Sequence, residues 1–541
     1  MRYAMYVAAL LASTAVIPAF AQMSDGDWPS YNRTLTSERF SPLTAITPAN
    51  AARMHKVCSY DLGRQTSFQT GPIVVGGTMY VTTDFDTIAL DAGNCSVKWR
   101  RTETYKPAGP LQVNRGAAFL DGRIFRGTQD GRVLAYDAAS GKPIWERAIA
   151  DPKLGETVPA APIAWDGLVF VGNAGGDIKG VKGRMYALDA KTGDIRWEFF
   201  LVPKDPNDVA RGPAAPATPE LEHRLAETWG NAEGVPVSGG ATWTSYTLDP
   251  ATGLLYVPGG NPAPDFVAEL RPGSNLFANS VVVLDARTGA YKRHMPMALH
   301  DYHDWDVSAT PALFTSKAGA KLLATAGKDG HLYVNSQDDG RQLHRTPVTT
   351  IENPTKPLTA AGTHFCPGTQ GGTEWNGPAY SPATNLIYTG AVDWCSTVRV
   401  APADQVRSVA LGQSWSGAAD TTQKPFGKFD PPEQWAGWIY ANDADSGQTR
   451  WRHKTKAPIL GAVTATEGGL VFAGDMAGTL VALDATSGKQ VWSTDTGGAI
   501  GGGVISYDAG GKQRIAVASG MVSPIWPTSK VNATVIVYGV E

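Results

Sequence analysis

The sequence has few cysteines, few charged residues and only one long apolar run. Its 541 residues contain four cysteines, and the patterns Cys-x-x-Cys and Cys-x-x-Cys-His are both absent, which argues against a zinc clip and a covalently attached haem. Charged residues make up 18% of the chain, the net charge is −3 and no basic stripe occurs, so nucleic acid is not expected as a partner. After residue 21, no apolar stretch reaches the ~20 residues that a membrane-spanning helix needs.

The apolar run lies at the N-terminus and has the layout of a secretory signal peptide. Arg2 supplies the positive end, Ala8 to Ile17 form the apolar stretch, and Ala19-Phe20-Ala21 is a small-x-small cleavage site. A membrane anchor is the alternative, but the run is short for it. We therefore expect residues 1–21 to be a cleaved signal peptide, residues 22–541 to be the mature chain, and the protein to be exported to the periplasm.

Glycine and proline are abundant, and a repeated turn accounts for many of them. The 60 Gly and 37 Pro favour tight turns over long helices. A pattern Ala-x-Asp-x-x-(Thr/Ser)-Gly-x-x-x-Trp recurs, complete or nearly so, with its Trp at positions 99, 145, 197, 451 and 492. Degenerate copies follow Asp249, Asp285 and Asn335, which makes about eight units. Each unit has apolar runs typical of strands, joined by hairpins in which Gly can adopt a positive φ.

Repeats of roughly 40–50 residues with four strands each are typical of propeller blades. We therefore predict an all-β, eight-bladed β-propeller that forms one domain over residues 22–541, with each Trp docking between neighbouring blades. A solenoid is the alternative, but radial closure explains the regular Trp positions better. Two stretches, Pro203 to Thr228 and Val398 to Trp435, interrupt the repeats and are predicted to be long loops over one face.

The four cysteines favour disulfides in an exported chain. The pairings Cys58–Cys95 and Cys366–Cys395 each close a loop about the size of one repeat. Other pairings remain possible from the spacing.

Several motifs lie outside the register of the repeat. They are Phe68-Gln69-Thr70-Gly71-Pro72, Val113-Asn114-Arg115-Gly116, Gly240-Ala241-Thr242-Trp243, Gly259-Gly260-Asn261-Pro262-Ala263-Pro264, His303-Asp304-Trp305-Asp306 and Gly327-Lys328-Asp329-Gly330. In these motifs and their order the chain resembles the quinoprotein alcohol dehydrogenases. Members of that family hold pyrroloquinoline quinone (PQQ) and a calcium ion at the axis of an eight-bladed propeller.

The resemblance implies a set of side chains that bind PQQ. Arg115 would bind a carboxylate of the cofactor, Trp243 would form the floor under its rings, and Lys328 would contact the quinone oxygens. Gln69 and Glu374 would contribute polar contacts. The family's vicinal cysteine pair is replaced here by Gly109-Pro110.

The resemblance also implies a calcium site and a catalytic base. Asp177, Asn261 and Asp306 would be the protein ligands of Ca²⁺, which prefers oxygen donors. Asp306 would also be the base that takes the hydroxyl proton, although the spacing of the motif keeps Asp304 and Asp301 as rivals. Relatives that use lanthanides carry a second Asp where this chain has Ser308, which favours calcium.

The reaction implied is oxidation of an alcohol to an aldehyde or ketone by hydride transfer to PQQ, with electrons passed to a separate periplasmic cytochrome c. Leu460 replaces a bulky Trp of some relatives, which indicates a roomier substrate cavity. Two alternatives remain. The same chemistry could act on a sugar or an aldehyde, or the chain could be a non-catalytic propeller scaffold of the type used in outer-membrane assembly.

Overall fold

The structure is a computed structural model, and it describes residues 24–106, 112–307, 309–419 and 426–541. The predicted signal peptide, Gly109-Pro110 and Ser308 lie outside the described residues. Helices are short: α1 spans Pro219–Glu227, α2 spans Ala403–Ser408, and four 3₁₀ turns span Ala51–Arg53, Pro152–Leu154, Ala268–Leu270 and Pro432–Gln434. In the part of the chain that the structure describes, no helix has the length and apolar character to cross a membrane.

In the described residues, 32 of the 40 strands build eight sheets of four antiparallel strands each, and β1 (Phe40–Ser41) adds a fifth, parallel strand to one of them. The first four sheets are β4 (Ile73–Val75), β5 (Thr78–Thr82), β6 (Asp86–Asp91) and β7 (Val97–Thr102); β9 (Ala118–Leu120), β10 (Arg123–Gly127), β11 (Arg132–Asp137) and β12 (Pro143–Ala148); β13 (Ile163–Trp165), β14 (Leu168–Gly172), β15 (Arg184–Asp189) and β16 (Ile195–Phe200); and β18 (Thr247–Asp249), β19 (Leu254–Pro258), β21 (Ser280–Asp285) and β22 (Tyr291–Pro296).

The other four sheets continue in chain order. They are β23 (Ala312–Thr315), β24 (Lys321–Ala326), β25 (His331–Ser336) and β26 (Gln342–Pro347); β28 (Ala379–Ser381), β29 (Leu386–Asp393), β32 (Ala436–Asp443) and β33 (Thr449–Thr455); β34 (Thr464–Thr466), β35 (Leu470–Gly474), β36 (Thr479–Asp484) and β37 (Gln490–Asp495); and β38 (Val504–Asp508), β39 (Gln513–Ser519), β40 (Thr534–Gly539) and β2 (His55–Asp61). The predicted all-β propeller architecture is confirmed.

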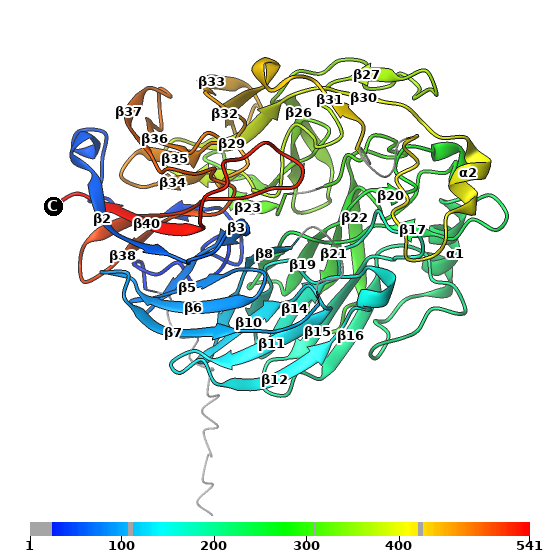
Figure 1. Ribbon diagram of the computed structural model, residues 1–541, viewed down its shortest axis with the longest axis horizontal. Helices are drawn as coiled ribbons and strands as arrows, with labels where there is room; N and C mark the ends of the chain where they lie inside the picture. Colours follow the sequence, from blue (N-terminus) through cyan, green and yellow to red (C-terminus); the bar gives the residue numbers. More distant parts are fainter. Residues whose placement is uncertain (1–23, 107–111, 308, 420–425) are drawn as a thin grey trace, which may run out of the picture.

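The two ends of the described chain meet in the last sheet. Strand β2, near the N-terminus, pairs antiparallel with β40, and β1 (Phe40–Ser41) pairs with β34. Figure 1 shows the sheets following one another around the molecule, with β2 in blue beside β40 in red. Short pairs supplement them: β3 (Ser67–Gly71) with β8 (Val113–Gly116), β17 (Ser238–Gly239) with β20 (Pro262–Ala263), and β27 (Thr363–Phe365) with β30 (Ser396–Val398) and β31 (Lys428–Phe429).

The repeated Trp contacts the hairpin of the next sheet along the chain. In β16, Trp197 lies directly opposite Ala187 of β15, and its indole N–H donates to the carbonyl of Ala286 at 2.9 Å. The same bond joins Trp145 to Ala190 at 3.2 Å. The same bond also joins Trp99 to Ala138 and Trp451 to Ala485. Trp492 instead donates to Met54, which lies just before β2 and not in a hairpin. The repeat is thus a set of contacts between sheets as well as a turn.

The two interrupting stretches contain helices, which corrects the prediction that they are entirely loop. In the first stretch, the side chain of Thr218 accepts a hydrogen bond from the N–H of Leu221 and caps α1. The second stretch contains α2. In the same stretch, the backbone N–H of Trp415 donates to the backbone carbonyl of Asp177 at 2.7 Å. The second stretch therefore covers the loop that carries a predicted metal ligand.

Two disulfides join Cys58 to Cys95 and Cys366 to Cys395. Cys58 lies in β2 and Cys95 in the hairpin between β6 and β7, so the first bridge ties the last sheet to the first four-stranded one. The second closes the loop that carries Glu374. Both predicted pairings are confirmed.

Candidate active site

The candidate site residues lie on short strands and loops from different sheets. Gln69 is in β3 and Arg115 is in β8, and these two strands run side by side in parallel. Trp243 follows β17, and Asn261 precedes β20. The remaining members lie in loops: Asp177 between β14 and β15, Asp306 between β22 and β23, Lys328 between β24 and β25, and Glu374 between β27 and β28.

Arg115 lies against two tryptophan rings. Its guanidinium carbon is 4.6 Å from the ring centre of Trp243 and 5.1 Å from that of Trp375, and Nη1 donates to the carbonyl of Trp243 at 2.9 Å. Nε of Arg115 is buried and has no hydrogen-bond partner among the described residues, and the same is true of Oε1 of Gln69. Because buried polar groups are normally hydrogen-bonded, these atoms mark a place for a polar ligand.

Asp306 is held from two sides. Its Oδ1 accepts from the backbone N–H of Asn261 at 2.7 Å, and its Oδ2 accepts from Nζ of Lys328 at 3.0 Å. A Cβ on Gly260 would lie 2.7 Å from Oδ1 of Asp306 and equally close to the carbonyl of Ala241. The pair of glycines before Asn261 therefore lets the backbone approach this carboxylate.

Lys328 also contacts a second carboxylate of the same loop. Oδ2 of Asp304 lies 3.3 Å from its Nζ. Burial by itself lowers the pKa of Lys328, but Asp304 and Asp306 raise it well above its usual value. The lysine therefore stays charged between two acidic side chains.

Asp301, the remaining rival for the base, has a different environment. Its Oδ1 accepts from the N–H of His303 at 3.1 Å and its Oδ2 from the N–H of Trp305 at 2.9 Å. These bonds shape the loop that ends at Asp306, so Asp301 has a structural part.

Glu374 links the Arg115 side of the site to the Lys328 side. Burial raises the pKa of Glu374 to about 8, although the charges of Lys328 and Arg115 act in the opposite direction. Burial has the opposite effect on a cation, and it lowers the pKa of Arg115 to about 10. Ionised groups are costly to bury here unless they are compensated.

The predicted metal ligands offer oxygen atoms only. Burial and, to a smaller extent, the negative charge of Asp306 raise the pKa of Asp177 to about 6, against the opposing effect of Lys328. A cation nearby would stabilise the ionised form of a carboxylate whose pKa is raised in this way. Nδ2 of Asn261 is occupied by hydrogen bonds, whereas no described residue donates to its Oδ1. Two carboxylates and a free amide oxygen suit Ca²⁺.

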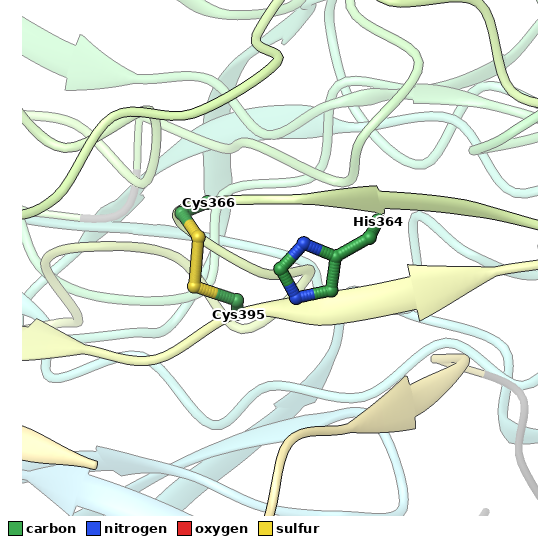
Figure 2. A group of neighbouring side chains, drawn as sticks. All are labelled: His364, Cys366 and Cys395. Carbon is green, nitrogen blue, oxygen red and sulfur yellow. A yellow bond between two sulfur atoms is a disulfide. The ribbon is translucent and has the colours of Figure 1, made fainter. Parts of the chain in front are cut away.

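A second group with metal-ligand residue types lies elsewhere. His364, Cys366 and Cys395 have their ligand atoms close together, but Figure 2 shows the two sulfur atoms joined in a disulfide. Metals bind cysteine as the thiolate. The imidazole of His364 instead contacts Asp430, 3.0 Å from its Nε2. We do not assign a metal centre to this group.

Comparison with known proteins identifies the family. The family model of the glucose/ethanol/alcohol dehydrogenase β-propeller domain, which is the PQQ model, matches residues 28–353. The chain belongs to the PQQ-dependent alcohol dehydrogenase family. A model of the outer membrane protein assembly factor BamB matches residues 436–523, which hold two of the repeats but none of the candidate site residues.

Individual PQQ-dependent relatives agree over most of the chain. The dehydrogenase subunit of the quinone-type alcohol dehydrogenase of Acetobacter aceti is 32% identical over 93% of this chain and 72% of its own length. PedH, a quinoprotein alcohol dehydrogenase of Pseudomonas putida, is 29% identical over 90% of this chain and 85% of its own length.

Solved structures give the same result. A europium-containing methanol dehydrogenase matches with a TM-score of 0.82 and 26% identity, over 95% of this chain and 98% of that one. The quinohemoprotein alcohol dehydrogenase of Comamonas testosteroni matches with a TM-score of 0.82 and 27% identity, over 95% of this chain and 80% of that one. The predictions of a PQQ-dependent alcohol dehydrogenase and of an oxidoreductase are confirmed.

The residues present fit the family's cofactor. PQQ is flat and carries carboxylates, and here two indole rings flank a buried arginine with an unpartnered Nε. The Asn376 side chain is 8% exposed and neither its Oδ1 nor its Nδ2 has a partner. The site thus has flat faces together with unused donors and acceptors.

Three neighbours of the site were not among the predicted residues. Trp375 contacts Arg115, Asn376 follows it, and Asp265 accepts a hydrogen bond from Asn261. Trp375 and Asn376 directly follow Glu374, so their position next to a predicted site residue was the signal in the sequence that could have found them. Asp265 directly follows the segment Gly259-Gly260-Asn261-Pro262-Ala263-Pro264, so adjacency was again the available signal.

Proposed function

We propose that this chain oxidises an alcohol to an aldehyde or ketone with bound PQQ and Ca²⁺. The observation that carries the proposal is the position of Asp306 between the N–H of Asn261 and the ammonium group of Lys328, inside the family fold. When bound, PQQ supplies a two-electron, hydride-accepting quinone and the cation supplies Lewis acidity.

The cofactor would be held by a buried arginine, a flat indole face and the polar side chains around them. Arg115 would pair with a carboxylate, and Trp243 would support the rings. Lys328 would place its charge beside the quinone oxygens, where a cation stabilises developing negative charge. Gln69 and Glu374 would complete the polar contacts. Asp177, Asn261 and Asp306 would hold the metal ion.

Asp306 would act as the base toward the substrate hydroxyl. Its carboxylate is 5% exposed and its orientation is fixed at both oxygens, which supports this role. Asp301 uses both oxygens on backbone N–H groups of its own loop. Asp304 shares Lys328 with Asp306, so the two are separated by mutation below.

The eight sheets are proposed to be the eight blades of one propeller domain over residues 22–541, with the Trp–carbonyl bonds as docking contacts between blades. Five such bonds and the pairing of β2 with β40 support this arrangement. Residues 1–21 would direct export to the periplasm, where a separate cytochrome c would accept the electrons. The curated relatives named above are quinone or quinoprotein alcohol dehydrogenases, which favours an alcohol over a sugar or aldehyde as the substrate.

Reconstitution tests the proposal. Purified protein freed of cofactors should reduce an artificial dye with an alcohol only after both PQQ and Ca²⁺ are added. Failure to retain PQQ absorbance after gel filtration would overturn the proposal. A panel of primary, secondary, polymeric and sugar alcohols would then identify the substrate class. Leu460, which packs among Trp375, Trp394 and Trp526, is the residue to enlarge when the cavity is probed.

A further inference from the structure

Asp265 is a buried carboxylate beside the proposed metal site. Its side chain is fully shielded from solvent, and its Oδ1 accepts a hydrogen bond from Nδ2 of Asn261 at 2.9 Å. Its Oδ2 has no partner among the described residues. Burial, Asp177 and Asp306 raise the pKa of Asp265, so a cation bound nearby would favour its ionised form.

The Asn261 amide has two chemically different ends, and only one can bind a cation. Its NH₂ group donates and its carbonyl oxygen accepts, while an ionised carboxylate accepts only. Asp265 therefore fixes the NH₂ group on its own side. The opposite atom, Oδ1, receives no hydrogen bond from the described residues. The backbone N–H of Asn261 meanwhile bonds to Asp306, which keeps this residue beside the other proposed ligands.

We propose that Asp265 is a positioning residue that turns the Asn261 amide so that its carbonyl oxygen, and not its NH₂ group, faces the bound cation. The inference rests on the proposed metal site. It adds Asp265 to that site through its hydrogen bond with Asn261. Asp265 also adds the negative charge of a further carboxylate, beside those of Asp177 and Asp306, and this charge favours a bound cation.

Arg271 makes Asp265 rigid enough for this role. Its guanidinium is fully buried and donates to the carbonyls of Pro264, Asp265 and Asp301 at 2.7–3.0 Å. Nη1 of Arg271 bonds to Oδ1 of Asn275 at 2.9 Å. One buried cation thus fixes the backbone of Asp265 and the start of the Asp306 loop together.

The test measures metal binding directly. The full chain with PQQ is freed of metal and titrated with Ca²⁺ by calorimetry and with Tb³⁺ by luminescence. Asp265→Ala should weaken Ca²⁺ binding about 10- to 100-fold, as expected for a residue that orients a metal ligand. Asp265→Asn retains an acceptor oxygen for Asn261 and should lose less.

A double mutant distinguishes orientation from mere structural support. Asn261→Asp presents an oxygen at either end and needs no orienting partner. Adding Asp265→Ala to Asn261→Asp should therefore change the Ca²⁺ Kd by less than about threefold. A full 10- to 100-fold loss in that background, or a Kd for Asp265→Ala within about threefold of wild type, would overturn the inference.

Two further measurements keep the outcomes separate. Asp86→Asn removes an equally buried carboxylate, which is paired with Arg100 at 2.8 Å and lies far along the chain from Asp265 and the proposed metal ligands. It should lower thermal stability and leave the Ca²⁺ Kd unchanged. If wild-type protein retains PQQ but binds neither Ca²⁺ nor Tb³⁺, the metal part of the proposed function is wrong, and the inference falls with it. If wild type binds Ca²⁺ and Asp265→Ala binds it equally well, only the inference falls.

Discussion

The repeated hairpins of the sheets and the candidate active site differ in how their polar groups are hydrogen-bonded. In the hairpins, Oδ1 of Asp137 accepts from both the N–H and the hydroxyl of Ser140, and Asp484 does the same with Ser487. In the site, Oε1 of Gln69 is buried and has no partner. The polar side chains of the hairpins find their hydrogen-bond partners within the hairpin, whereas those of the site need a ligand. We therefore expect the hairpins to support the fold and the site to support the chemistry.

The largest effect is expected from Asp306→Asn, which removes a base but preserves shape. Loss of a general base should lower kcat/KM with an alcohol about 10²- to 10⁴-fold, measured by dye reduction in the presence of PQQ and Ca²⁺. Asp304→Asn is the matched control, because it removes the other carboxylate beside Lys328. A greater loss in Asp304→Asn than in Asp306→Asn would move the base assignment to Asp304.

Gly260→Ala tests how closely the backbone must approach the site. The added Cβ would lie 2.7 Å from both Oδ1 of Asp306 and the carbonyl of Ala241, so one of them must move. Misplacement of a catalytic group by about 1 Å can cost roughly 100-fold in rate, and we expect a loss of that size in kcat/KM. Activity at the wild-type level in correctly folded Gly260→Ala would show that the site tolerates the shift.

The same contrast explains what the sequence could predict. Periodicity predicted the sheets and the recurring position of the Trp, because each copy supports the interpretation of the others. Arg115 and Asp306 were found only by resemblance to a family, since single buried polar residues have no period. Asp265 was missed because its part depends on an amide orientation that only the folded loop defines. The helices α1 and α2 were missed because interrupting stretches rich in Pro and polar residues are typical of loops.

The contact between neighbouring sheets can be tested with two glycines of a single sheet. Gly167 and Gly193 both have positive φ, at 78° and 75°, but a Cβ on Gly193 would lie 2.6 Å from the ring of Trp145, whereas nothing lies near one on Gly167. Both Ala variants should lose about 1–2 kcal/mol of unfolding free energy from backbone strain. Gly193→Ala should lose about 1–3 kcal/mol more from overpacking.

Chemical denaturation of the protein without cofactors measures both variants. Activity per folded molecule should be unchanged in each, because neither glycine lies near Asp306. Equal losses of stability in the two variants would show that the ring of Trp145 moves aside freely and that the contact contributes little.

A change in how stability depends on pH is also expected, and it should have opposite signs in the two regions. Burial raises the pKa of Glu374 from 4.5 to about 8, so the folded protein without cofactors holds this proton more tightly than the unfolded chain. Its contribution is present below about pH 4.5 and is lost as the pH rises through about 8. Glu374→Gln should therefore match wild type in acid and be the more stable of the two above about pH 8.

Asp137 in the hairpin should behave in the reverse sense. Hydrogen bonds from Ser140 lower the pKa of Asp137 below 3.8, so its contribution is present at neutral pH and is lost as the pH falls through the lowered value. Asp137→Asn should be less stable than wild type at neutral pH and should approach it in strong acid. Thermal melts of the two variants across the pH range measure both trends. Two differences from wild type that change in the same direction with pH would contradict the contrast, because the site would then bind its protons no more tightly than a solvated hairpin does.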